Sequence, residues 1–165
     1  MGVGKTSVGQ VLARCCDMDF VDADTDIEKN AKMPISRIFH LHGEGHFRCL
    51  EYDFYLKLSY VQNTVIATGG GAILDERIRT ILRKNTFVVY LMASPEVVYF
   101  RIAADESRPL LSGGDKKTII ADMLSEREAL YRQTCHVVIN TNNMDINECA
   151  EKVSQMFFDL TKRLR

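Results

Sequence analysis

The sequence contains no long apolar run, no excess of charge of either sign and no regular spacing of cysteines. No stretch approaches the roughly eighteen apolar residues that cross a bilayer, which excludes a membrane span and favours a cytoplasmic protein. The net charge of -1 excludes the basic surface on which nucleic-acid-binding proteins depend. The five cysteines are odd in number and lack C-x-x-C spacing, so we expect reduced thiols rather than a disulfide framework or a zinc site.

Internal repeats and low-complexity linkers are also absent, which indicates a single domain. A chain of 165 residues is of ordinary size for one domain with its own core. The 46% hydrophobic and 26% charged residues are typical of a globular rather than a disordered chain. We therefore expect one domain over residues 1–165, present as a monomer.

Short apolar runs alternate with stretches of helical periodicity along the chain. The expected strands are 19–22, 64–68, 86–92 and 136–140, and the expected helices are 6–16, 44–61, 75–83, 95–104, 116–134 and 146–164. This alternation predicts an α/β fold, a parallel sheet covered by helices on both faces, with ligands at the carboxyl ends of the strands. Turn-forming residues between 103 and 117 predict a mobile loop.

The chain opens with the second half of a phosphate-binding loop, because residues 1–7 match the end of G-x-x-x-x-G-K-[ST]. Backbone N–H groups of such a loop surround nucleotide phosphates at a helix N-terminus, the lysine reaches the β- and γ-phosphates, and the threonine hydroxyl ligates Mg²⁺. A chance match is the alternative. The candidate nucleotide-binding residues are Gly2, Val3, Gly4, Lys5, Thr6 and Ser7.

The first glycine of the motif would precede Met1, so we expect the natural chain to begin about ten residues upstream.

Three carboxylates, Asp22, Asp24 and Asp26, follow the strand expected at 19–22. Such crowding is costly unless a cation or a shared proton relieves it. Because alternate residues of an extended segment project to different sides, Asp22 can help to hold Mg²⁺ while Asp24 faces an acceptor hydroxyl. An N-cap of the following helix is the alternative, and it accounts for one aspartate rather than three.

A run of three glycines, Gly69 to Gly71, directly follows Thr68 at the end of another expected strand. Consecutive glycines sacrifice backbone entropy and suit a place where a ligand approaches the main chain closely. A tight turn is the alternative, although it needs one or two glycines. We therefore predict that a small polar substrate lies against this segment.

Four arginines, Arg48, Arg108, Arg127 and Arg132, lie on segments near these clusters. The guanidinium group offers a rigid fork for a carboxylate or phosphate, so their convergence would indicate an anionic substrate. Taken singly, each is more typical of a solvated surface residue or an i,i+4 partner.

Taken together, these motifs resemble the shikimate kinase family along essentially the whole chain. Six motifs occur in the family's order: Gly2-Val3-Gly4-Lys5-Thr6, Phe20-Val21-Asp22-Ala23-Asp24, Gly43-Glu44-Gly45-His46-Phe47-Arg48, Thr68-Gly69-Gly70-Gly71, Arg108-Pro109-Leu110-Leu111 and Arg127-x-x-x-Tyr131-Arg132. The resemblance implies a P-loop three-layer α/β/α fold with a lid at about 103–117, and transfer of the γ-phosphoryl group of MgATP to the 3-hydroxyl of shikimate. It also implies that the strand before the phosphate loop is central, and that this strand is missing from the chain.

The resemblance also implies roles for individual residues. Lys5, Asp24 and Arg108 would be catalytic, with Asp24 on the reacting hydroxyl and Arg108 on the transferring phosphoryl group, and Thr6 and Asp22 would hold the metal. The shikimate-binding residues would be Asp24, Arg48, Glu51, Gly69, Gly70, Gly71 and Arg132, with Arg48 and Arg132 on the carboxylate. Arg101 and Asn142 would contribute to the adenine pocket.

Two other functions stay open. A related small-molecule kinase of the gluconate type would share the phosphate loop but would not need paired arginines for a carboxylate. A non-catalytic nucleotide-binding regulator could share the fold. The presence of Asp24 and Arg108 favours an enzyme.

Overall fold

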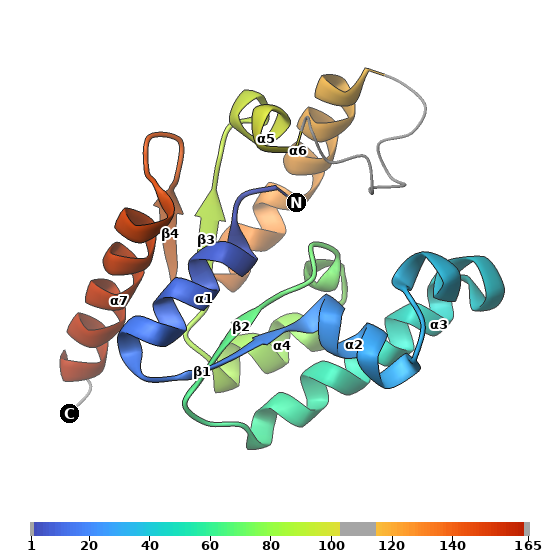
Figure 1. Cartoon of the computed structure of the whole chain (residues 1–165), viewed down its shortest axis with the longest axis horizontal. Coiled ribbons are helices and arrows are strands. Elements are labelled where there is room, and N and C mark those ends of the chain that lie inside the picture. The colour runs from blue at the N-terminus through green and yellow to red at the C-terminus, as the bar shows by residue number, and fades with distance from the viewer. Residues whose placement is uncertain (1, 103–114, 164–165) are drawn as a thin grey trace.

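Short parallel strands alternate with helices along the chain, as the sequence predicts. The computed structural model describes residues 2–102 and 115–163. The elements are α1 (Lys5–Cys16), β1 (Asp19–Asp22), α2 (Ala23–Ala31), α3 (Ile35–Lys57), η1 (Leu58–Tyr60), β2 (Thr64–Ala67), η2 (Ala72–Leu74), α4 (Glu76–Asn85), β3 (Val89–Met92), α5 (Pro95–Ile102), α6 (Lys116–Thr134), β4 (Val137–Asn140) and α7 (Ile146–Arg163). Their arrangement is shown in Figure 1. Arg108 lies outside the described residues, and so does most of the lid expected at 103–117.

The strands form two parallel pairs, which confirms the predicted α/β class. β1 pairs with β2 from Asp19 opposite Thr64 to Asp22 opposite Ala67, and β3 pairs with β4 over four residues in the same manner. Within the described part of the chain, β2 and β3 do not pair with each other. A largely apolar cavity of about 470 Å³ is lined by both strands and by α1. Because β1 and β2 run in the same direction, Asp22 and the glycine segment emerge at one edge of the sheet.

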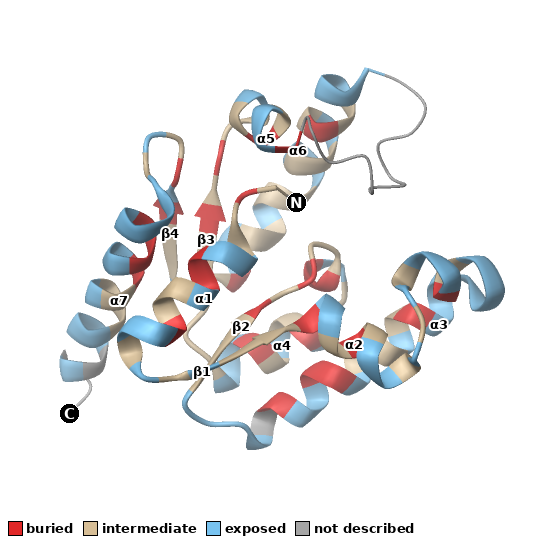
Figure 2. Cartoon of the chain, viewed as in Figure 1, coloured by how far each residue is buried: buried red, intermediate tan, exposed pale blue. Residues whose placement is uncertain are grey.

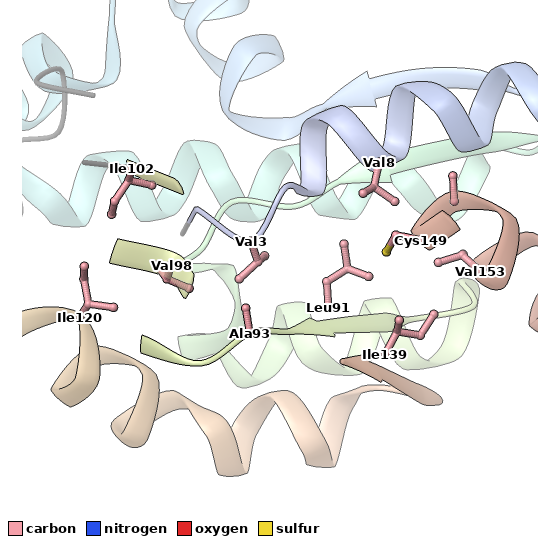
Figure 3. Packing of buried hydrophobic residues seen from close by; sticks show 11 residues of the cluster. Val3, Val8, Leu91, Ala93, Val98, Ile102, Ile120, Ile139, Cys149 and Val153 are labelled. Carbon is pink, nitrogen blue, oxygen red and sulfur yellow. The ribbon is translucent and has the colours of Figure 1, made fainter. Parts of the chain in front are cut away.

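Two separate buried clusters stabilise the chain. The first surrounds β3 and β4 and includes Val3 and Val8 from the start of the chain; Figure 3 shows its side chains converging from several elements. The second lies among α2, α3 and α4 and includes Ile38 and Tyr55. In Figure 2 the buried faces of these helices turn inward while their outer faces are exposed. None of the described helices is long and apolar enough to cross a membrane.

Most expected elements occur within a few residues of their predicted bounds, but two helical segments were missed. α2 begins at Ala23, directly after the strand, because the Asp22 carboxylate caps it and Asp24 and Asp26 occupy its first turn, where negative charge is favourable. The expectation of an extended segment here was wrong. α3 begins at Ile35 rather than at 44, and it is interrupted at Gly43, whose φ of 78° and ψ of 168° are not helical.

Candidate active site

The phosphate-loop segment turns sharply before α1. Gly2 and Gly4 have φ angles of 67° and 90°, a region that glycine enters without a steric penalty. Gly4 is the N-cap of the twelve-residue α1, so Lys5 and Thr6 lie in its first turn. The first N–H groups of a helix have no partner within the helix and favour an anion. This end of α1 is therefore suited to a phosphate group.

The threonine of this loop contacts the first aspartate of the acidic cluster. The Thr6 hydroxyl donates to Asp22 Oδ2 at 2.7 Å, while Asp22 Oδ1 accepts from the backbone N–H of Thr25 at 3.2 Å. Asp22 therefore caps α2 with one oxygen and faces the phosphate loop with the other. Two side-chain oxygens from different elements meet here, and oxygen is the ligand atom that Mg²⁺ prefers.

Two carboxylates lie against the glycine segment. A Cβ atom at Gly69 would lie 2.7 Å from Asp24 Oδ1 and 2.9 Å from Glu51 Oε1, so a larger residue there would displace both groups. Glu51 on α3 is only 1% exposed. Burial raises the pKa of its carboxyl, and the hydrogen bond from Arg48 opposes that rise.

Arg48 is held beside the last glycine by two carboxylates of its own helix. Its Nη1 lies 2.7 Å from Glu51 Oε2, and its Nη2 lies 2.8 Å from Glu44 Oε1. A Cβ atom at Gly71 would lie 2.6 Å from Arg48 Nη1. The two ion pairs place the guanidinium group against the main chain, and the side chain retains 27% exposure through which an anion can reach it.

A second arginine reaches the glycine segment from α6. Arg127 Nη1 donates to the Gly70 carbonyl at 3.2 Å, and the Tyr131 hydroxyl donates to the same carbonyl at 2.9 Å. The structure does not bring Arg132 to this segment: its Nε donates to Glu128 at 2.8 Å and its side chain is half-exposed. On a helix, Arg132 lies about 100° round the axis from Tyr131, and its Nη2 lies 3.5 Å from Met92 Sδ at the end of β3.

The sequence groups Arg127 with the other arginines, but the resemblance does not assign it to the shikimate-binding residues. The signal that could have done so is the spacing of Arg127 and Tyr131, because residues at i and i+4 share one helix face. The tyrosine hydroxyl and the guanidinium group are both hydrogen-bond donors. On one helix face, next to the glycines that follow a strand, they are suited to binding a backbone carbonyl or an anion.

Of the two expected adenine-binding residues, Arg101 lies on α5 and Asn142 follows β4. Arg101 donates to the Thr141 carbonyl at 2.7 Å and to its hydroxyl at 3.0 Å, and it lies 3.4 Å from the Val3 carbonyl. It therefore connects α5, the phosphate loop and the segment after β4. The Asn142 side chain accepts from the Ser94 N–H at 2.9 Å, a bond that joins the segments following β3 and β4.

Comparison with known families matches nearly the whole chain. A model of the shikimate kinase family matches residues 1–157. Among curated proteins, a shikimate kinase of Francisella philomiragia is 41% identical over 162 residues, which cover 98% of this chain and 92% of that protein. A shikimate kinase of Caldicellulosiruptor saccharolyticus is 40% identical, covering 93% of this chain and 88% of that protein.

Solved structures give the same result. The structure of a shikimate kinase from Acinetobacter baumannii in complex with shikimate has a TM-score of 0.92 and 36% identity, covering 100% of this chain and 91% of that one. A shikimate kinase from Aquifex aeolicus has a TM-score of 0.83 and 27% identity, with 98% and 94% covered. The fold described above is thus shared with these proteins.

Proposed function

The chain belongs to the shikimate kinase family, and on that premise we propose that it transfers the γ-phosphoryl group of ATP to the 3-hydroxyl of shikimate. We propose further that residues 1–165 act as one domain with one acceptor site and one nucleotide site. The observation that supports the acceptor best is the convergence of Arg48, Arg127 and Asp24 on the glycine segment.

The acceptor site matches a small molecule that carries one carboxylate and several hydroxyl groups. Arg48 and Arg127 offer planar forks that suit a carboxylate. The polar main chain of residues 69–71 offers partners for ring hydroxyls. Asp24 is exposed and lies against Gly69, whereas Arg48 lies against Gly71. This arrangement would place the reacting hydroxyl at Asp24 and the carboxylate at Arg48.

The nucleotide would lie on the phosphate loop. The N-terminus of α1 would bind the β- and γ-phosphates with Lys5 as a mobile positive charge. Thr6 and Asp22 fit Mg²⁺ because their oxygens already lie 2.7 Å apart and because this ion prefers oxygen ligands. When bound, Mg²⁺ supplies charge stabilisation to the phosphate oxygens. Arg101 and Asn142 would lie beside the adenine, and Arg108 would stabilise the transferring group.

The reaction would be a direct in-line transfer. The acceptor oxygen forms a bond to the γ-phosphorus while the bond from that phosphorus to the β,γ-bridging oxygen breaks, and ADP leaves. Asp24 accepts a hydrogen bond from the hydroxyl, orients its oxygen and takes its proton. The positive charge of Lys5 opposes the charge that develops on the phosphoryl oxygens. No covalent enzyme intermediate is required.

The test is a coupled assay of ADP release with shikimate, with gluconate and without an acceptor. We expect release that depends on shikimate. Release that depends on gluconate instead would favour the gluconate-type kinase. A folded chain that binds ATP but does not release ADP with either acceptor would favour the non-catalytic regulator and would contradict the proposal.

A further inference from the structure

The glycine segment is anchored by tyrosine hydroxyls from two different helices. The Gly69 N–H donates to the hydroxyl of Tyr55 on α3 at 3.3 Å, and the hydroxyl of Tyr131 on α6 donates to the Gly70 carbonyl at 2.9 Å. These bonds hold a stretch of three glycines. Glycine has more backbone freedom than any other residue type, so without the bonds the stretch could adopt many conformations. The two hydroxyls act in opposite senses, one as acceptor and one as donor.

We propose that Tyr131 is a positioning residue for the acceptor: its hydroxyl fixes the Gly70 carbonyl and thereby orients both Arg127 and the glycine backbone. This inference rests on the proposed function, because it concerns the acceptor that residues 69–71 would bind. It adds a role for a side chain that need not touch the acceptor.

Two donors share the Gly70 carbonyl. A carbonyl oxygen has two lone pairs, and Gly70 uses its oxygen for both Tyr131 at 2.9 Å and Arg127 at 3.2 Å. The Arg127 guanidinium has five N–H donors in a fixed fork, and its bond to Gly70 holds one point of that fork. Any rotation of the Gly70 carbonyl would move that point as well. The shorter bond from Tyr131 restrains this rotation.

The two anchored peptide groups lie on either side of a third one in the chain. The Gly69 N–H belongs to the peptide group before Gly69, and the Gly70 carbonyl belongs to the one after Gly70. The peptide group that joins Gly69 to Gly70 therefore lies between two anchored neighbours. Because peptide groups are planar, fixing the two neighbours limits the orientation of the middle one. Tyr55 alone would leave the Gly70 end free to turn.

The Tyr131 side chain is itself held by packing. Its ring stacks on Tyr90 of β3, with centroids 4.9 Å apart and an interplanar angle of 19°. Burial raises the pKa of the Tyr131 hydroxyl, although the nearby Arg127 opposes that rise. The hydroxyl thus keeps its proton near neutral pH and remains a donor. The sheet, through Tyr90, holds the donor in place.

The kinetic test compares Tyr131→Phe with Tyr90→Phe. Both variants keep the stacked ring pair, and only the first removes the hydroxyl that contacts Gly70. We expect Tyr131→Phe to raise the KM for shikimate by about 3- to 10-fold, the effect of one hydrogen bond, and to leave the KM for ATP unchanged. Tyr90→Phe should change neither. A change of both KM values, or a similar effect in the two variants, would show a structural role only and would overturn the proposal.

A second measurement does not depend on the reaction. The Gly71 amide nitrogen belongs to the same peptide group as the Gly70 carbonyl, so its ¹⁵N chemical shift reports a hydrogen bond to that carbonyl. We expect this shift to move in Tyr131→Phe and to stay in Tyr90→Phe. No movement would refute the anchor itself. A shift that moves while the KM for shikimate stays unchanged would refute the positioning role. A wild-type chain that is inactive with shikimate would refute the proposed function, and the chemical shift alone would then test the anchor.

Discussion

The Thr6 hydroxyl donates to the Asp22 carboxylate at 2.7 Å, across sixteen positions of the sequence. The bond joins the first turn of α1 to the N-cap of α2. It therefore connects the segment that would bind phosphate with the segment that carries Asp24. Asp22 Oδ1 caps the helix, whereas Oδ2, in the proposed function, serves the metal.

Two substitutions of Asp22 separate these roles. Asp22→Asn should keep the cap, since asparagine caps as well as aspartate does, but should weaken the apparent affinity for Mg²⁺ by about 10- to 100-fold. Asp22→Ala should in addition lower the free energy of unfolding by about 1 kcal/mol. Activity titrated with Mg²⁺ and urea unfolding measure the two effects. An unchanged Mg²⁺ requirement in Asp22→Asn would remove Asp22 from the metal site.

Asp24 should matter for turnover rather than for nucleotide binding. We expect Asp24→Asn to lower kcat by about 10²- to 10⁴-fold, the range of general acid–base contributions, with little change in the KM for ATP. Asp26→Asn is the matched control, because Asp26 lies in the same first turn but accepts from Asn30. Equal kinetics for the two variants would mean that Asp24 takes no part in the chemistry.

Gly71 should be required for the position of Arg48. Its φ of -96° suits any residue, so Gly71→Ala should fold, but the new Cβ would displace the guanidinium group. We expect kcat/KM for shikimate to fall on the order of 10²-fold, as misplaced groups cause. Gly45→Ala is the control: nothing lies near its Cβ, and alanine there should stabilise α3 by about 0.5–1 kcal/mol. Equal kcat/KM in wild type and Gly71→Ala would contradict the assignment of Arg48.

His136 should make stability depend on pH. Its Nδ1 accepts from the Val88 N–H at 2.9 Å, and partial desolvation together with Arg83 lowers its pKa below the ordinary value of 6.5. As pH falls through 6.5, the unfolded chain binds a proton more readily than the folded chain, so the free energy of unfolding should decrease. In His136→Asn the amide oxygen can accept without titrating, and the decrease should be smaller. Urea unfolding from about pH 7.5 to about pH 5 compares the two, and identical profiles would contradict this role.

The sequence predicts the fold better than it predicts the orientation of the site. The bounds of α6 agree with the prediction because its helical periodicity is uninterrupted. The start of α2 was missed because Asp22, Asp24 and Asp26 were interpreted as an extended acidic segment. Acidic residues are also favourable in a first helical turn, and the sequence alone does not decide between an extended segment and a helix start.

The choice between Arg127 and Arg132 shows where prediction from the sequence ends. Both lie on α6, and only the rotation of that helix about its axis relative to residues 68–71 decides which one reaches Gly70. Tertiary packing sets this rotation. That a ligand approaches the glycines stays a prediction, and the structure adds that Asp24, Glu51 and Arg48 lie against this segment.

We expect the two buried clusters to mark units that open separately. Val3 and Val8, next to the phosphate loop, belong to the first cluster, whereas Phe47, Tyr55 and Ala72, next to the acceptor residues, belong to the second. Regions with separate cores commonly exchange their amide hydrogens through separate sub-global openings. ATP alone should therefore slow exchange in the first unit, and shikimate alone should slow it in the second. When ATP and shikimate are both bound, the two units, which the Thr6–Asp22 bond joins, should open as one.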